Sequence, residues 1–209
     1  MIAVVDYGMG NLHSMAKAFE YLGEDVVVTS SAGDLVAAER IVLPGVGAFG
    51  ECMDNLRSTG LIDVLRTEVI EGSKPFLGVC VGMQLLAGVG LEHGSHDGLG
   101  WLPGSVVELL PGADGVRIPH TGWNEISLAD AAPISPFAAV KSGEAFYFNH
   151  SYTLVVDDDS LVAARCTHGS PFVAAVARGN IVATQFHPEK SQRAGIDFLA
   201  DFTVWEPGG

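Results

Sequence analysis

The stretch PFLGVCVGMQLL, residues 75–86, limits the possible folds of this chain more than any other segment. An apolar run leads into Gly-Val-Cys-Val-Gly, and an amphipathic segment follows. A nucleophile between two glycines, where a buried strand turns sharply into a helix, is typical of a nucleophile elbow. Gly78 and Gly82 stand where the strained turn leaves no room for a side chain. The pattern predicts Cys80 as a nucleophile at a strand end; the alternative is a small buried hydrophobe.

Strand-like and helix-like runs alternate along the first half of the chain. This alternation predicts a parallel sheet covered by helices on both faces. We therefore expect one α/β domain over residues 1–209, with a twisted, mixed, mainly parallel sheet flanked by helices. The early strands are expected at 2–5, 26–29, 41–43 and 76–80. Antiparallel strands are expected later, at 106–110, 116–119, 145–156, 161–166, 172–176 and 181–185.

Two helices beside these strands can also be expected. Apolar residues recur at helical spacing over 56–71, which leads into the strand of the elbow. Another helix is expected after Ser191, whose hydroxyl can cap its first turn.

Composition excludes several classes of function. The 209 residues include 11 basic and 25 acidic side chains, a net charge of −14, which argues against binding to nucleic acid or an anionic membrane. Three cysteines without a CxxC pair favour neither a disulfide framework nor a structural zinc site. There is no signal-peptide pattern at the start and no apolar segment long enough to span a membrane. We expect a cytoplasmic enzyme.

Two glycine loops follow expected strands. DYGMGN, residues 6–11, lacks the third glycine of a dinucleotide-binding fingerprint, because His13 stands in its place. It is interpreted as a tight turn or a partner-facing loop. PGVG, residues 44–47, can bring backbone N–H groups close to a reacting carbonyl, beside the N–H of Val81.

A catalytic thiol needs a base, and His187 is the best candidate among seven histidines. It ends an apolar strand, and Glu189 follows two residues later, on the same face of an extended chain. The carboxylate can then fix the tautomer of the imidazole. The alternative is a pair of solvated residues at a strand end.

The other histidines favour structural roles. His150 lies in the aromatic run FYFNHSY and is expected to be packed and hydrogen-bonded. His120, near Trp123, lines either an interface or a cleft, and His168 is expected in a turn. No pair has the spacing of metal ligands, so no metal site and no cofactor are expected.

The motifs GVCVGMQLL, QFHPEKS and PGVG together resemble those of class I, triad-type glutamine amidotransferases. More narrowly, the chain resembles the glutaminase subunits of imidazole glycerol phosphate synthase, from Asp6 to about residue 200. The segments that carry this likeness are DYGMGNLHS, PGVGAFG, GLGWLPG, HTGWNEI, FNHSY and FHPEKS.

The resemblance implies a reaction. Cys80 attacks the side-chain amide of glutamine, His187 protonates the leaving ammonia, and Glu189 orients His187. A γ-glutamyl thioester forms, and water releases glutamate from it. The resemblance further assigns the oxyanion to the N–H groups of Gly47 and Val81, and glutamine binding to Gln84, Tyr147, Ser151 and Tyr152.

The resemblance also implies a heterodimer with a (β/α)₈ cyclase subunit. Ammonia would pass through the interface and react with the ribulosyl intermediate PRFAR, giving imidazole glycerol phosphate and AICAR in histidine biosynthesis. The motifs that face this partner place Asn11, His120, Trp123 and Lys190 at the interface.

Alternatives remain beside this interpretation. One is another class I glutaminase, of pyridoxal phosphate or anthranilate synthase, which Lys190 and the GWNE motif argue against. Others are a non-catalytic scaffold that binds a barrel partner, or a reactive-thiol stress protein. The sequence departs from the common pattern at Val81, Trp101 and Thr121; the last two affect the expected interface.

Overall fold

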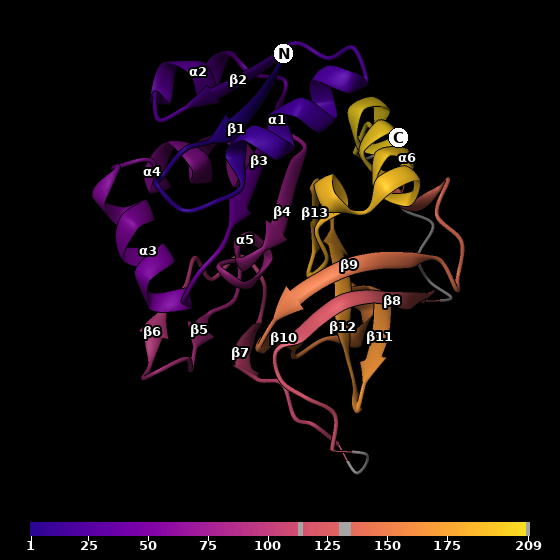
Figure 1. Ribbon diagram of the computed structural model, residues 1–209. Helices are drawn as coiled ribbons and strands as arrows, with labels where there is room; N and C mark the ends of the chain where they lie inside the picture. Colours follow the sequence, from indigo (N-terminus) through magenta and orange to yellow (C-terminus); the bar gives the residue numbers. More distant parts are fainter. Residues whose placement is uncertain (113–114, 130–134, 208–209) are drawn as a thin grey trace.

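The computed structural model describes residues 1–112, 115–129 and 135–207, and a nine-stranded mixed sheet runs through it (Figure 1). Its strand order is β2-β1-β3-β4-β13-β12-β11-β8-β9. The first five of these strands are parallel: β2 (Val26–Thr29), β1 (Ile2–Val5), β3 (Arg40–Gly45), β4 (Phe76–Cys80) and β13 (Ile181–Thr184). The others pair antiparallel: β12 (Ser170–Arg178), β11 (Val162–His168), β8 (His120–Leu128) and β9 (Ala145–His150).

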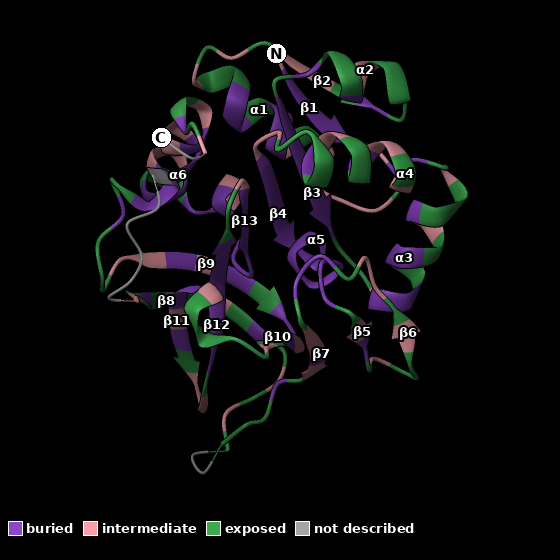
Figure 2. Ribbon diagram, turned by 180° about the vertical axis from the view of Figure 1, so that it is seen from behind, coloured by how far each residue is buried: buried purple, intermediate pink, exposed green. Residues whose placement is uncertain are grey.

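Helices cover the parallel part of the sheet, with their apolar sides turned inward and their outer sides exposed (Figure 2). On one side α1 packs against α6, and on the other α2 packs against α4. Within the described ranges, no helix has the length and apolar character that crossing a membrane requires. The helices are α1 (Leu12–Tyr21), α2 (Ala32–Ala37), α3 (Phe49–Ser58), α4 (Ile62–Leu65), the π-helix η1 (Arg66–Glu71), α5 (Val81–Gln84) and α6 (Gln192–Val204).

A second, four-stranded sheet was not expected from the sequence. Its order is β10-β7-β5-β6, with bounds β10 (Tyr152–Val156), β7 (Gly104–Glu108), β5 (Val89–Gly90) and β6 (His96–Asp97). The expectation of one strand over 145–156 is therefore wrong: β9 belongs to the large sheet, and after Ser151 the chain enters the small one. Apolar alternation continues through Ser151, so the pattern could not reveal the change of sheet.

Three other local expectations are also wrong. Residues 116–119 form no strand; β8 begins only after Pro119, which has no N–H for a ladder. The helix expected over 56–71 is interrupted at Gly60, whose φ is +70°. Ser191 precedes α6 without capping it, and its hydroxyl instead donates to the His187 carbonyl and accepts from the Tyr147 N–H.

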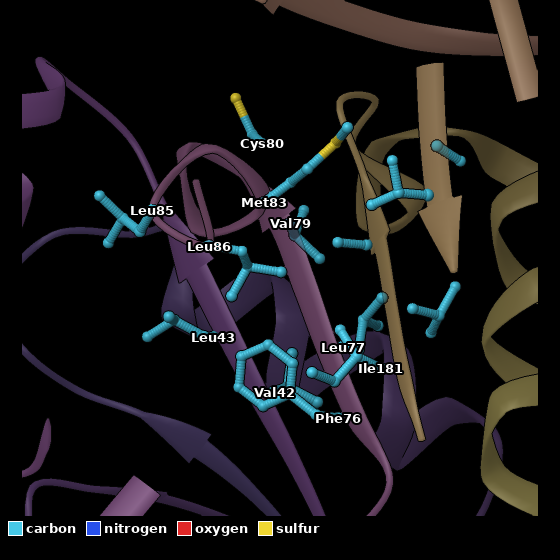
Figure 3. Close-up of a cluster of buried hydrophobic side chains, with 14 of the residues drawn as sticks. Val42, Leu43, Phe76, Leu77, Val79, Cys80, Met83, Leu85, Leu86 and Ile181 are labelled. Carbon is cyan, nitrogen blue, oxygen red and sulfur yellow. The ribbon is translucent and has the colours of Figure 1, made fainter. Parts of the chain in front are cut away.

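The elbow strand is buried along its whole length. Phe76, Leu77 and Val79 pack among neighbouring apolar side chains, while Cys80 points away from this cluster beyond the strand end (Figure 3). Gly78 and Gly82 flank the turn as the sequence predicts. A side chain on Gly82 would collide with the backbone carbonyl of Leu43, and one on Gly78 would lie 2.9 Å from the Gly82 oxygen.

This crowding makes Gly82→Ala a test of the elbow. The added methyl group meets β3 backbone, which cannot move aside like a flexible side chain, so we expect the free energy of unfolding to fall by about 3 kcal/mol. Gly33→Ala in α2 is the control, because its methyl group makes only an ordinary contact, at 3.6 Å, with Ser31 Oγ. Chemical denaturation measures both. Equal stability of the two variants would contradict a close-packed elbow.

Candidate active site

Cys80 ends β4 in a strained backbone conformation. Its φ and ψ are +56° and −111°, in the left-handed half of conformational space that side chains other than glycine rarely adopt. The next residue, Val81, begins α5. Although Cys80 is only 2% exposed, it lines a cavity, so its sulfur faces free space rather than the core. The buried-hydrophobe alternative does not account for this strain.

His187 reaches the same edge of the sheet because β13 runs parallel to β4 and pairs with it. Its Nδ1 lies 2.9 Å from Glu189 Oε1, and the two side chains are 3% and 2% exposed. They are thus a buried pair and not two solvated residues. With Nδ1–H donated to the carboxylate, Nε2 is left for the sulfur.

The electrostatics of His187 follow from its neighbours. Burial alone would lower the pKa of His187, but the Cys80 sulfur and the Glu189 carboxylate, through charge and hydrogen bonding, raise this pKa to about 9. The imidazole is therefore protonated at neutral pH. A positive ring between a sulfur and a carboxylate can stabilise a thiolate and also donate a proton.

Cys80 and His187 line a cavity of about 250 Å³, which suits a small metabolite. Of the residues proposed from the sequence for substrate binding and the oxyanion, five line it. Tyr147 does not; its ring lies 6.4 Å from that of His187, centroid to centroid. The lining residues are Val46, Gly47, Cys80, Val81, Gln84, Glu92, Pro119, Asn149, His150, Ser151, Tyr152 and His187.

Sequence reasoning missed Gln185, which is fully buried beside the sulfur. Its Nε2 lies 3.8 Å from Cys80 Sγ, and its Oε1 accepts from Gln84 Nε2 at 3.0 Å. Gln84 also donates to the Tyr152 carbonyl at 2.9 Å. A signal was present: Gln185 precedes His187 by two residues, so both side chains share one face of an extended segment. Asn149, whose carbonyl lies 4.0 Å from the sulfur, was also missed.

The PGVG loop is held from behind by a second cysteine. Cys52 Sγ, on α3, donates to the Val46 carbonyl at 3.4 Å. This carbonyl shares a planar peptide with the Gly47 N–H, so fixing one end orients the other. Burial raises the pKa of Cys52 to about 12, which keeps the thiol protonated as a donor. Cys52 had no assigned role in the sequence interpretation.

His120 and His150 form a neutral hydrogen-bonded chain behind the cavity. His150 Nδ1 donates to the Tyr152 carbonyl at 2.9 Å, so its Nε2 accepts from His120 Nδ1 at 3.1 Å. His120 Nε2 in turn accepts from Asn124 Nδ2 at 3.2 Å. Burial lowers the pKa of His120 to about 3 and that of His150 to about 4. The chain supports the segment on which Tyr152 lies.

The lowered pKa values predict a loss of stability in acid. An unfolded histidine takes up its proton near pH 6.5, whereas these folded histidines resist protonation until about pH 4 or below, so the free energy of unfolding should decrease across that window. Denaturation of wild type and His120→Gln between pH 7 and pH 4 measures the effect. The variant should show a shallower decrease. His13→Gln, at an exposed position on α1, is the control and should follow wild type.

An exposed aromatic and basic cluster, Trp123, Tyr147 and Lys190, lies next to His187. Trp123 is 48% exposed, its ring is 6.2 Å from that of Tyr147, and Lys190 Nζ lies 5.8 Å above the Tyr147 ring. His120, expected at the same interface, is 3% exposed and lies behind this surface. Asn11, half-buried before α1, makes no side-chain cap there.

Comparison with known sequences matches residues 3–205 to the family Glutamine amidotransferase class-I. A Geobacter sulfurreducens protein called imidazole glycerol phosphate synthase subunit HisH is 47% identical over 205 residues, which cover 96% of this chain and 97% of the relative. The protein of the same name from Zymomonas mobilis is 46% identical over 211 residues, covering 99% and 96%.

Solved structures share the fold. One described as a glutamine amidotransferase superimposes with a TM-score of 0.74 at 21% identity and covers 98% of this chain and 100% of that one. A chain of PurLQS from Thermotoga maritima gives 0.71 at 22% identity, covering 97% and 96%. At this identity the likeness concerns the fold alone.

Proposed function

Because this chain belongs to the class I glutamine amidotransferases, and within them to the HisH glutaminase subunits of imidazole glycerol phosphate synthase, we propose that Cys80, His187 and Glu189 hydrolyse L-glutamine. The observation that supports this most is the buried ion pair of His187 and Glu189 beside a strained Cys80. No metal or cofactor is needed for the steps below.

The Cys80 thiolate attacks the side-chain carbonyl carbon of glutamine, and the carbonyl oxygen becomes an oxyanion. The N–H groups of Gly47 and Val81 are proposed to hold this oxyanion. His187 gives its proton to the amide nitrogen, and ammonia leaves as the thioester forms. Water then loses a proton to His187 and attacks the thioester, which releases glutamate and restores the thiolate.

For substrate binding we propose Gln84, Tyr147 and the Ser151–Tyr152 backbone. The Gln84 amide is bonded to Gln185 and to the Tyr152 carbonyl, so its contribution is to shape the cavity wall that meets the α-groups of glutamine. Tyr147 lies outside this wall and is proposed to act through His187, whose ring it neighbours.

The chain is one subunit of a complex, as the names of its relatives indicate. We propose that its partner is the (β/α)₈ cyclase subunit HisF, bound in the cytoplasm as a heterodimer. The exposed aromatic and basic cluster is the proposed docking surface, together with Asn11 and with His120 as its support. Its position beside His187 gives ammonia a short, sheltered route to PRFAR in the cyclase.

The test is glutamate release by this chain with purified HisF and PRFAR. We expect strong release in the complex and little from the isolated chain. A scaffold without catalysis predicts no release in either sample. A thiol sensor predicts peroxide consumption at Cys80 without any dependence on glutamine. Substituting the pyridoxal phosphate or anthranilate synthase partner should give no activation.

A further inference from the structure

A second cavity, of about 650 Å³, opens at the opposite end of the parallel strands from Cys80. The turn before β13, at Gly179 and Asn180, forms part of its wall, together with Ile181, which pairs with Phe76 at the start of β4. The helical segments α3, α4 and η1 contribute the other side. It is thus separate from the site that contains Cys80 and His187.

Three arginines line this cavity: Arg57 on α3, Arg66 on η1 and Arg178 at the end of β12. Asp63 is the one acidic residue among its described lining residues. The whole chain has 11 basic residues against 25 acidic ones. Gathering three positive side chains in one hollow is costly in mutual repulsion unless an anion compensates them.

Two of the arginines are held in place from outside the hollow. Arg57 donates to the Asp54 carboxylate at 3.1 Å and to the Asp97 carbonyl at 2.6 Å, and Arg178 donates to the Trp101 carbonyl at 2.7 Å. Each guanidinium has five N–H donors, so further donors remain. Arg66 makes no hydrogen bond or ion pair with any residue in the described part of the chain.

The rest of the wall is apolar and includes an aromatic ring. Trp101, 7% exposed, is fixed by an edge contact with Phe76, with ring centroids 5.3 Å apart. Ile70 remains 43% exposed at the wall. Arg66 and Ile70 both belong to the π-helix η1, and π-helical turns inside helices are frequent at functional sites.

We propose that this cavity binds a small organic phosphate with a flat, apolar ring. The planar arginine fork matches the oxygens of a phosphate in pairs, and two or three arginines can neutralise its double charge. Trp101 and Ile70 then cover the ring, which inorganic phosphate cannot exploit. The site is independent of glutamine hydrolysis.

Phenyl phosphate is the probe, titrated by calorimetry into the complex of this chain with its cyclase subunit. We expect saturable binding with one site per chain, weakened about ten-fold or more in Arg66→Gln/Arg178→Gln, since each lost hydrogen bond to a charged group costs more than a factor of ten. Arg193→Gln, an exposed arginine on α6 paired with Asp197, should bind as wild type does. So should Cys80→Ala, which separates this site from the active site.

A second measurement protects against a folding artefact and against the cyclase as the binder. The isolated chain should show a change of tryptophan fluorescence with phenyl phosphate, absent in Trp101→Phe, while circular dichroism confirms that each variant is folded. Inorganic phosphate should bind at least about ten-fold more weakly. Absence of saturable binding, or binding unchanged in the double variant, would overturn the proposal.

Discussion

Replacing Cys80 by alanine is expected to abolish glutamine hydrolysis, with kcat lowered by about 10⁴-fold or more. The sulfur carries the covalent bond of the proposed thioester, and the variant has no other nucleophile at this position. Glutamate release in the presence of the cyclase subunit and PRFAR is the measurement. Glutamine should still bind, because the walls of the 250 Å³ cavity remain. The loss should therefore appear in kcat and not in glutamine affinity.

Cys166→Ala is the control for this substitution. Cys166 is also a free, buried cysteine, but it lies on β11, outside the cavity. We expect its activity to stay within about two-fold of wild type, as for a change that touches no reacting group. Activity that persisted in Cys80→Ala would remove this residue from the mechanism. The proposed thioester would then be excluded as well.

The elbow could be predicted from the sequence because its requirements are local. Two glycines at fixed distances from Cys80 report backbone contacts that the structure contains, at the Gly82 oxygen and at β3. The pairing of His187 with Glu189 is local in the same sense, since the spacing of two residues sets it. Their meeting with Cys80 depends on β13 lying beside β4, which the resemblance implied and no spacing could show.

Other parts of the site depend on contacts between distant segments. Gln185 reaches the sulfur across 105 residues of sequence, and Cys52 reaches Val46 from a helix with no catalytic motif. Ser151 lies at the change from one sheet to the other, where the apolar pattern continues unbroken. Such contacts are set by how strands and helices pack, and a single sequence contains no periodic signal for them.

The second large effect is expected at His187, with a smaller one at Glu189. His187→Ala removes the proton donor for ammonia, and Glu189→Ala removes only the group that orients and charges it. By analogy with triads in which the carboxylate is the less critical member, Glu189→Ala should retain about 10²-fold more activity than His187→Ala. Glutamate release with the cyclase subunit measures both variants. Equal losses would contradict an orienting role for the carboxylate.

Glu189→Gln separates the charge of this carboxylate from its position. The amide oxygen of glutamine can still accept the Nδ1–H of His187, now 2.9 Å from Oε1, but it no longer stabilises the positive ring. In wild type the pKa of His187 is raised to about 9, so the imidazolium is present below this pH, and kcat should fall as pH rises through it. In Glu189→Gln this alkaline decrease should move to lower pH. An unmoved decrease would assign it to another group and leave the carboxylate with a purely steric role.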